Sequence, residues 1–349
     1  MKQDIIIAED LGRSLQEAIG RVEHDRLFVL VDTTTHNLCW PVISGLPAMS
    51  GAQIISIPPT DDAKTLETLS AVWTALQRGG ATRHSLMVNL GGGMVTDLGG
   101  FAASTFKRGM AYINIPTTLL SQVDASVGGK TGINFGGLKN EIGVFNCASS
   151  VILSSTFLRT LDSANLLSGY AEMLKHGLLS TDGELNRLLG FDITSPNYGT
   201  LQQMVAKSVS IKEDIVEHDP TEKGIRKALN LGHTAGHAME SLALEEGRTV
   251  LHGYAVAWGL VMELYLSVCK CGFPSMEMQR IASYGREHYG RFFYECRHYD
   301  RLYEFMCHDK KNEGGHINFT LLGGVGDIRI NQVATRQEIE EMLDYYRES

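Results

Sequence analysis

The sequence has few of the features that mark secreted, membrane-spanning or nucleotide-hydrolysing proteins. Its six cysteines are scattered without a CxxC pair, so neither a disulfide framework nor a cysteine-rich metal site is expected. The chain shows no run of about 18 apolar residues, the length that a membrane span requires. The only apolar run near the N-terminus, IIIA, is too short for a signal sequence. We therefore expect a cytoplasmic protein with reduced thiols and no membrane partner.

An excess of positive charge is also missing. The chain carries 31 Lys and Arg against 40 Asp and Glu, a net charge of −9, and the two signs are interspersed. This balance gives no electrostatic reason to expect a nucleic-acid partner. An anionic small molecule would need a local cluster of cations. With 349 residues, 43% of them hydrophobic, the chain is long enough for two domains.

The pattern of apolar residues changes along the chain. In the first part, β-rich runs alternate with helical patterns, which predicts a parallel sheet covered on both faces. The expected strands there are Ile5–Ala8, Leu27–Val31, Gln53–Ile57 and Leu86–Leu90. The expected helices are Leu11–Val22 and Ala63–Leu76. Long amphipathic stretches follow, at Ala164–Leu179, Tyr198–Glu217, Ala228–Glu245, Tyr254–Lys270 and Ser275–His288, and a strand returns only at His316–Leu322. We predict an α/β domain over 1–155 and a mostly helical domain over 156–349.

A glycine-rich turn follows the fourth expected strand, in the segment LMVNLGGGMVTDLGGF. Gly91, Gly92 and Gly93 would let backbone amides and a helix N-terminus approach a pyrophosphate. A tight turn that binds nothing is the alternative, and the segment is not a GxGxxG fingerprint. The strand ending at Asp32 offers a carboxylate of the kind that binds a ribose hydroxyl.

The segment DASVGGKTGIN contains a GGKT run without the spacing of a phosphate-binding P-loop, because Asp124 stands where that motif needs glycine. Lys130 and Lys139 lie in glycine-rich backbone together with an acid, an amide and threonines. A single lysine of this kind is usually solvated at the surface. The cluster as a whole favours contact with a ligand.

The helical half contains a candidate metal site. His233 and His237 are four residues apart on one expected helix face, which allows two imidazoles to bind one ion. Together with Glu172 they would form a three-ligand site with open positions, as in catalytic zinc enzymes. The HExxH motif of metalloproteases is absent. His252 is a third candidate ligand, core histidines are the alternative, and spacing leaves open which two histidines bind.

Five segments in this order, GGGMVTDLGGF, RGMAYINIPTTLLSQVDASVGGKTGIN, GYAEMLKHG, ALNLGHTAGHAME and LHGYAVAWG, resemble the 3-dehydroquinate synthase family over about Val29–Leu322. The resemblance implies a Rossmann-like NAD-binding α/β domain followed by a mostly helical metal-binding domain, in a homodimer. It implies the conversion of 3-deoxy-D-arabino-heptulosonate 7-phosphate to 3-dehydroquinate and phosphate, in the shikimate pathway of aromatic amino acid biosynthesis. NAD would act catalytically with Zn²⁺ or Co²⁺.

The resemblance also implies roles for individual residues. It makes Glu172, His233 and His252 the metal ligands and leaves His237 to the substrate, against the i, i+4 pairing that spacing favours. Further catalytic or substrate-binding positions are Asp124, Lys130, Asn140, Lys175, Lys212, Arg226, Asn230 and Lys310, with Arg108 reaching across a dimer interface. Lys311 adjoins Lys310, so either lysine could point inward.

The cofactor positions that the resemblance implies are Asp32, Lys64, Gly91, Gly92, Gly93, Asp97, Thr117, Thr118, Lys139, Phe157 and Thr160. The chain departs from the family pattern at Asp61-Asp62-Ala63, ahead of Lys64, and around Leu161–Ala164.

Three alternatives remain at this point. A related cyclase acting on a substrate without a carboxylate would not need Lys175, Lys212, Arg226 and Asn230 together. A metal- and NAD-dependent polyol dehydrogenase would not need the phosphate-binding cations. A binding protein without catalysis is the third, and no missing polar residue favours it.

Overall fold

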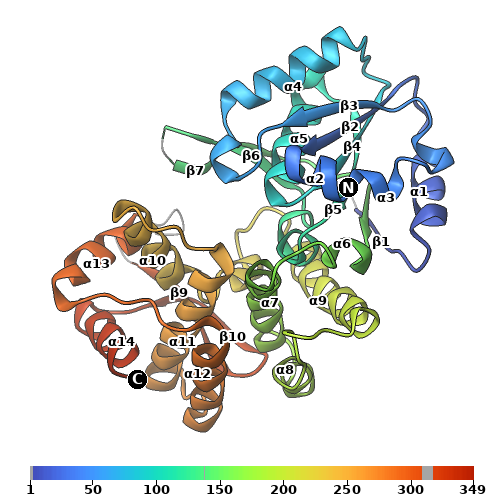
Figure 1. Cartoon of the computed structure of the whole chain (residues 1–349). Coiled ribbons are helices and arrows are strands. Elements are labelled where there is room, and N and C mark those ends of the chain that lie inside the picture. The colour runs from blue at the N-terminus through green and yellow to red at the C-terminus, as the bar shows by residue number, and fades with distance from the viewer. Residues whose placement is uncertain (1–2, 137, 309–316) are drawn as a thin grey trace. The chain divides into compact units, whose positions relative to one another are not determined.

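The computed structural model describes residues 3–136, 138–308 and 317–349, and the chain forms two compact units (Figure 1). Unit 1 contains the residues up to Asp162 together with Asn197–Val209, and unit 2 contains Ser163–Pro196 and Ser210–Ser349. The boundary after residue 155 stays a prediction. The return of a short later segment to the first unit has no counterpart in the sequence patterns.

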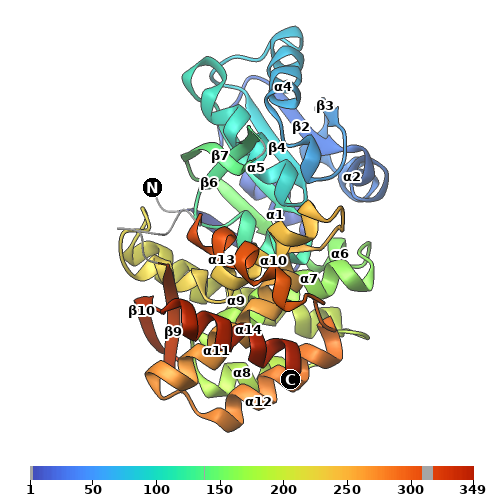
Figure 2. The ribbon, with the colours of Figure 1, turned by 90° about the vertical axis from the view of Figure 1, so that its left-hand side faces the viewer.

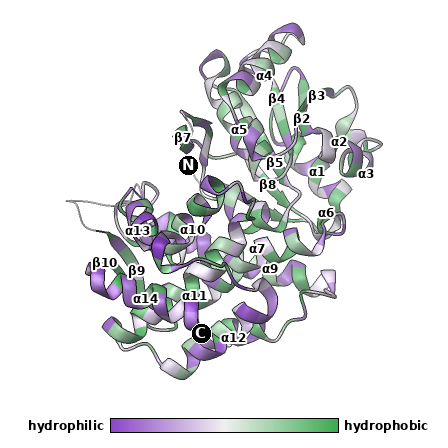
Figure 3. Ribbon diagram, turned by 60° about the vertical axis from the view of Figure 1, so that its left-hand side comes forward, coloured by the Kyte–Doolittle hydropathy of each residue, from purple (hydrophilic) through white to green (hydrophobic). Residues whose placement is uncertain are grey.

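Unit 1 is built on a six-stranded parallel sheet with the order β1-β8-β5-β4-β2-β3. Its strands are β1 (Asp4–Ile7), β2 (Leu27–Asp32), β3 (Gln53–Ile57), β4 (Leu86–Gly91), β5 (Ala111–Pro116) and β8 (Ser150–Leu153). Strands β2 and β4 are buried along their whole length and hydrophobic in colour (Figure 3). A strand covered on both faces must be apolar on both sides, which is why these runs do not alternate. The predicted parallel α/β domain is confirmed.

Helices cover both faces of this sheet. Leu15 of α1 (Leu11–Gly20) and Ile43 of α3 (Trp40–Ile43) share one core with Val29 and Val88. On the other face, Gly99 of α5 lies so close to Asn89 of β4 that a Cβ would overlap its side chain. The other helical segments of unit 1 are α2 (Thr33–Leu38), η1 (Pro47–Met49), η2 (Asp61–Ala63), α4 (Leu66–Arg78), α5 (Gly93–Thr105), η3 (Phe106–Arg108), η4 (Ser121–Ala125) and α6 (Ser155–Leu158). An antiparallel hairpin of β6 (Lys130–Phe135) and β7 (Leu138–Phe145) extends from the chain after η4.

Unit 2 is mostly helical, as predicted. Its elements are α7 (Ser163–Leu178), α8 (Asp182–Leu189), η5 (Ile225–Asn230), α10 (His233–Glu245), α11 (His252–Cys271), α12 (Ser275–Tyr289), η6 (Cys296–His298), α13 (Tyr299–Cys307), β9 (Asn318–Gly324), β10 (Asp327–Val333) and α14 (Arg336–Glu348). Helix α9 (Tyr198–His218) begins in the segment assigned to unit 1 and ends in unit 2. Strand β10 was not predicted, and His316, the start of the predicted strand, lies outside the described residues.

The helix predicted over Ala228–Glu245 is wrong at its start. The chain forms the 3₁₀ segment η5, turns at Gly232, and begins α10 only at His233. Gly232 has φ of +79°, in the left-handed region, and a Cβ there would come within 2.8 Å of the Leu260 side chain. Glycine is therefore required at this break.

Helix α11 is the central helix of unit 2, with α7, α10, α12, α14 and β9 packed against it. Figure 2 shows the β9–β10 pair beside it. By length and composition alone α11 could cross a membrane, which the sequence analysis did not anticipate. Two-thirds of its apolar stretch, 67%, is buried inside the protein. A core helix surrounded by neighbours needs apolar residues on all sides, and this explains the composition.

Candidate functional site

Three helices of unit 2 bring the predicted metal ligands together, and glycines let their backbones approach closely. A Cβ on Gly253, next to His252, would overlap the Ser168 carbonyl of α7. The Gly253 amide donates to the Ser168 hydroxyl at 3.1 Å, one helical turn before Glu172. A Cβ on Gly259 of α11 would overlap the Gly232 carbonyl at the start of α10. Close main-chain contact thus fixes α7, α10 and α11 beside one another.

Glu172, His233 and His252 form a compact cluster. The Glu172 Oε1 atom lies 3.4 Å from His233 Nε2 and 3.5 Å from His252 Nε2. Ligand atoms bound at 2.0–2.1 Å to a tetrahedral ion are about 3.3 Å apart, so these separations match the edges of such a site. His237 belongs to the same group, because ring nitrogens of the three histidines lie within 4.8 Å of one another.

Each of the two histidines closest to Glu172 is oriented through its other ring nitrogen. His233 Nδ1 lies 3.1 Å from the Leu231 carbonyl oxygen, and His252 Nδ1 lies 3.3 Å from Glu240 Oε2. With an oxygen acceptor at Nδ1, a neutral ring keeps its proton there, and the Nε2 lone pair is then the one that a metal ion in the cluster would use. This is the outer hydrogen bonding that accompanies histidine ligands of metals.

The electrostatics of the cluster suit a cation. Glu172 is fully buried, and neither of its oxygens makes a hydrogen bond of regular geometry with the described residues. Burial acts to raise its pKa, but Lys175, in contact with its Oε2, and His233 hold the pKa well below its usual range. Burial likewise lowers the pKa of His252, but Glu172 and Glu240 outweigh it and raise the pKa to about 10. A buried, ionised carboxylate with incomplete hydrogen bonding is costly unless a charge compensates it, so the donor set fits zinc or cobalt.

Further predicted residues of unit 2 are buried polar groups. Lys212 of α9 and Arg226 of η5 are 5% and 2% exposed. Arg226 donates from Nη1 to the Pro220 carbonyl at 2.7 Å, and Asn230 Nδ2 donates to Glu222 Oε1 at 2.9 Å. Long cationic side chains are seldom fully buried unless they are paired. Lys310 and Lys311 lie outside the described residues.

In unit 1, the predicted glycine turn joins β4 to α5. Gly92 precedes the first residue of α5 and no side chain caps that helix end. A Cβ on Gly92 would come within 3.1 Å of the Thr118 side chain, and the Thr117 amide donates to the Gly91 carbonyl at 2.9 Å. The structure therefore places the glycine turn and both predicted threonines at the same strand ends, where a helix N-terminus favours an anion.

Asp32, Phe157 and Thr160 have structural partners in unit 1. Asp32 Oδ1 accepts the amides of Thr34 and Thr35 at 2.7 and 2.8 Å and so caps α2. Phe157 is fully buried in the core, which leaves only its backbone for contact with a ligand. Thr160 Oγ1 donates to the Phe157 carbonyl at 2.7 Å.

Lys64 and Asp97 form a largely buried ion pair. Lys64 Nζ lies 2.7 Å from Asp97 Oδ2, with side-chain exposures of 4% and 18%. Burial raises the pKa of the Asp97 carboxyl above its usual range, against the opposing effect of Lys64. Asp61 lies 3.8 Å from the same lysine and 3.6 Å from Lys139 Nζ. The structure therefore groups three of the predicted cofactor residues, Lys64, Asp97 and Lys139.

Four predicted residues occupy irregular or exposed backbone in unit 1. Asp124 is half-buried in η4, a single π-helical turn, a conformation found often at functional sites. Lys130, Asn140 and Arg108 are exposed. Asn140 and Arg108 have φ of 52° and 69°, which is strained for residues other than glycine.

Sequence reasoning missed two acidic residues near the metal cluster, Glu240 and Glu263. Glu240 lies within the motif HTAGHAME, seven residues after His233, so helical periodicity could have identified it. Glu263 lies 30 residues beyond His233 on another helix, and nothing in the sequence links the two.

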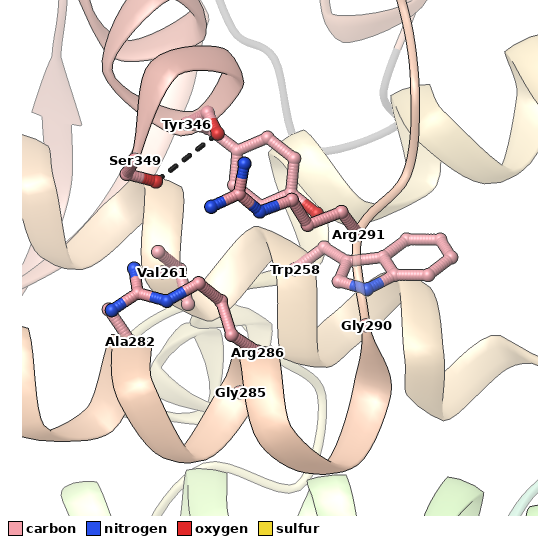
Figure 4. Close-up of a pocket in the computed structure, with 9 residues that line it drawn as sticks. All are labelled: Trp258, Val261, Ala282, Gly285, Arg286, Gly290, Arg291, Tyr346 and Ser349. Carbon is pink, nitrogen blue, oxygen red and sulfur yellow. Dashed lines mark hydrogen bonds between the residues drawn. The ribbon is translucent and has the colours of Figure 1, made fainter.

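A small pocket elsewhere in unit 2 contains none of the predicted site residues (Figure 4). Trp258, Arg286, Arg291 and Tyr346 contribute to its walls, and Ser349 Oγ donates to the Tyr346 carbonyl at 3.2 Å. Its arginines are exposed at the surface.

The chain is similar to proteins of one family along most of its length. The pattern described as 3-dehydroquinate synthase N-terminal matches residues 54–168, and the C-terminal pattern matches 169–312. The 3-dehydroquinate synthase of Parabacteroides distasonis is 54% identical over 348 residues, covering 100% of this chain and 99% of its own. That of Streptococcus pyogenes is 35% identical over 320 residues, covering 91% and 89%.

Solved structures share the fold. The 2-epi-5-epi-valiolone synthase of Streptomyces hygroscopicus, with NAD⁺ and Zn²⁺ bound, has a TM-score of 0.85 at 26% identity, covering 100% of this chain and 97% of that one. A 2-deoxy-scyllo-inosose synthase with carbaglucose-6-phosphate, NAD⁺ and Co²⁺ has a TM-score of 0.83 at 22% identity, covering 99% and 96%. The predicted combination of an α/β domain and a helical domain is confirmed by this likeness.

Proposed function

This chain belongs to the 3-dehydroquinate synthase family, and from that premise we propose that it converts 3-deoxy-D-arabino-heptulosonate 7-phosphate to 3-dehydroquinate and phosphate. It is a carbon–oxygen lyase that depends on NAD and a divalent metal, and it forms the first carbocycle of the shikimate pathway. The observation that carries the proposal is the cluster that His233 and His252 form with the fully buried Glu172 carboxylate. A sugar phosphate is the substrate class of the enzyme.

Glu172, His233 and His252 hold the metal ion, which is Zn²⁺ or Co²⁺, and His237 contacts the substrate. When bound, NAD would supply reversible hydride transfer at one substrate carbon, and the ion would supply a lowered pKa of the hydroxyl there. Lys175 stabilises the ionised form of Glu172, so the carboxylate is ready as a ligand at neutral pH. Glu240 and Leu231 keep Nδ1 protonated on the two ligand histidines.

The cations of unit 2 bind the ends of the substrate. Lys212, Arg226 and Asn230 hold its carboxylate and hydroxyls, because a charged fork and an amide donor match those oxygens. The burial of Lys212 and Arg226 makes their hydrogen bonds stronger than they would be in water. Lys175 and His237 also face the substrate oxygens.

In unit 1, the cofactor contacts are those of the glycine turn, the two threonines beside it, and the Lys64–Asp97 pair, with Asp32, Lys139, Phe157 and Thr160 completing them. Asp124 orients the substrate. Lys130, Asn140 and Arg108, together with Lys310 from the C-terminal half of the chain, bind phosphate or move protons at the leaving group. Arg108 does so across a two-fold interface, so the active species is a homodimer, and the enzyme acts in the cytoplasm.

Phosphate release from 3-deoxy-D-arabino-heptulosonate 7-phosphate tests the function directly. The purified chain is assayed with catalytic NAD, before and after chelation and after zinc is added back, while absorbance reports NADH. We expect chelator-sensitive phosphate release without accumulation of NADH, and 3-dehydroquinate as the product. Absence of phosphate release with metal and NAD bound would exclude this substrate and point to a sugar phosphate without a carboxylate. Net NADH formation from a polyol would instead identify a dehydrogenase.

A further inference from the structure

We propose that Glu263, a fully buried carboxylate on α11, is a positioning residue that sets His233 relative to His252. The inference rests on the metal site of the proposed function. It concerns a residue outside the predicted metal-binding and substrate-binding residues, and it follows from how α10 begins.

Helix α10 lacks a cap of its own. Its N-cap position is Gly232, which has no side chain, so the first amides of the helix need an acceptor from elsewhere. Glu263 provides it. Its Oε2 accepts the Gly232 amide at 2.7 Å, and its Oε1 accepts the Ala235 amide at 3.1 Å.

These two amides lie on either side of the ligand residue His233. A carboxylate that accepts two backbone amides at a helix N-terminus makes charge-assisted hydrogen bonds and also interacts favourably with the helix dipole. Movement of the first turn of α10 would break one or both bonds. The position of the His233 backbone is thereby tied to the position of Glu263.

Glu263 is on the same helix as the other histidine ligand. His252 is the first residue of α11, and Glu263 follows three turns later on that helix. The carboxylate therefore connects the start of α10, which carries His233, to the middle of α11, the helix that begins at His252. The contact of Gly259 with the Gly232 carbonyl restricts the same junction sterically, so the hydrogen bonds act on backbones that are already in van der Waals contact.

The choice of a carboxylate at this position is informative. Glu263 is fully buried, and a buried charge is less stabilising than an apolar group of similar volume unless its bonds are all of good geometry. A metal site tolerates displacements of only about 0.5 Å before its geometry is lost. The two carboxylate oxygens of Glu263 therefore fix the position of the His233 backbone, in addition to any stability that they contribute.

The test compares Glu263→Gln with Ser267→Ala. The glutamine keeps one acceptor oxygen but places an NH₂ group against a backbone amide. Ser267 lies one turn further on α11, is fully buried, donates to the Glu263 carbonyl at 2.7 Å and accepts the Leu322 amide at 3.0 Å. Ser267→Ala therefore removes a matched number of buried hydrogen bonds from the same helix, away from the start of α10.

Zn²⁺ affinity is measured by competition with a chromophoric chelator, and the visible spectrum of the Co²⁺-loaded protein reports the ligand geometry. For Glu263→Gln we expect a zinc dissociation constant raised at least about tenfold and an altered Co²⁺ spectrum. For Ser267→Ala we expect the zinc dissociation constant and the Co²⁺ spectrum to match those of the parent, even if its melting temperature falls as far as that of Glu263→Gln. If Glu263→Gln does not fold, Glu263→Asp, which keeps the charge with a shorter reach, is measured for the same effects.

Parental zinc affinity and an unchanged Co²⁺ spectrum in the Glu263 variant would overturn the inference and leave Glu263 as a simple helix cap. A parent chain that binds no metal would overturn both this inference and the proposed function. A parent that binds metal normally but releases no phosphate would refute the proposed function alone.

Discussion

His252 and Glu240 form a pair, with His252 Nδ1 lying 3.3 Å from Glu240 Oε2 while His252 Nε2 faces Glu172. The pair determines which nitrogen keeps the proton in the neutral ring that a metal ion would bind. Because Glu240 is on α10 and His252 is on α11, it also joins these two helices near the cluster. Two acids thus act on one histidine, one from each side of its ring.

Replacing Glu240 by alanine should weaken metal binding by about 10- to 100-fold, the usual effect of losing such an outer partner. Zinc competition against a chelator measures this. Glu245→Ala is the matched control, since Glu245 is on the same helix but forms an exposed ion pair with Arg301 at 2.7 Å. Equal affinities in the two variants would refute the role of Glu240.

The set of ligands can be separated by two substitutions. His252→Ala should lose bound metal and activity while NAD binding stays close to that of the parent, because the predicted NAD contacts are all in unit 1. His237→Ala should keep stoichiometric metal and lose turnover. Metal analysis and NAD titration of both variants are the measurements. Metal loss in His237→Ala with metal retained in His252→Ala would restore the i, i+4 pair as the ligands.

Gly259→Ala should disturb the metal site, although Gly259 is not one of the predicted metal ligands. The new Cβ would overlap the Gly232 carbonyl, and such overpacking costs about 1–3 kcal/mol of folding free energy. The free energy of unfolding, measured by chemical denaturation, and the metal content should both fall. Gly285→Ala on α12 is the control, because its Cβ would meet nothing closer than 3.4 Å. Retention of full stability and metal content by Gly259→Ala would show that α10 and α11 can separate at no cost.

Asp97→Asn should change how stability depends on pH. Burial raises the folded-state pKa of Asp97 above the ordinary value of 3.8, so its contribution to stability is fully present below that value and is lost as pH rises through the folded pKa. Asparagine does not ionise. The free energy of unfolding of the variant relative to the parent should therefore increase with pH across this range.

Urea denaturation at several pH values, from acid to neutral, measures the effect. Asp62→Asn, at an exposed acid in the nearby turn, should show a small difference that does not grow with pH. If the free energy of unfolding relative to the parent rises equally with pH in both variants, the buried pair of Asp97 with Lys64 is not the source of the pH dependence. NAD affinity should fall in Asp97→Asn only.

Local patterns predicted the helices whose sequence periodicity is uninterrupted. The helix predicted over Ser275–His288 is α12, which ends one residue later. The start of α10 was missed because Gly232 interrupts a pattern that is helical on both sides, and the left-handed φ it needs arises from contact with α11. The placement of Asn197–Val209 in unit 1 depends on long-range packing, about which periodicity carries no information.

The site shows the same division between local and distant information. Spacing along one helix favoured His233 with His237, since neighbours on a helix face are all that spacing can detect. The structure brings His252 about as close to Glu172 as His233 is, because α7 and α11 meet at Gly253. Glu263 escaped detection for the same reason, as its hydrogen bonds cross between helices that are separated by a loop.

The glycine contacts among α7, α10 and α11 have a practical consequence for anyone who alters this protein. Because the main chain itself sets the distances between the three helices, the arrangement of the ligand positions is a property of the scaffold and persists when a ligand side chain is exchanged. The ion should therefore be removable and replaceable without refolding the chain. Redesign of metal preference can vary residues 172, 233 and 252, provided that the glycines at 232, 253 and 259 are left untouched.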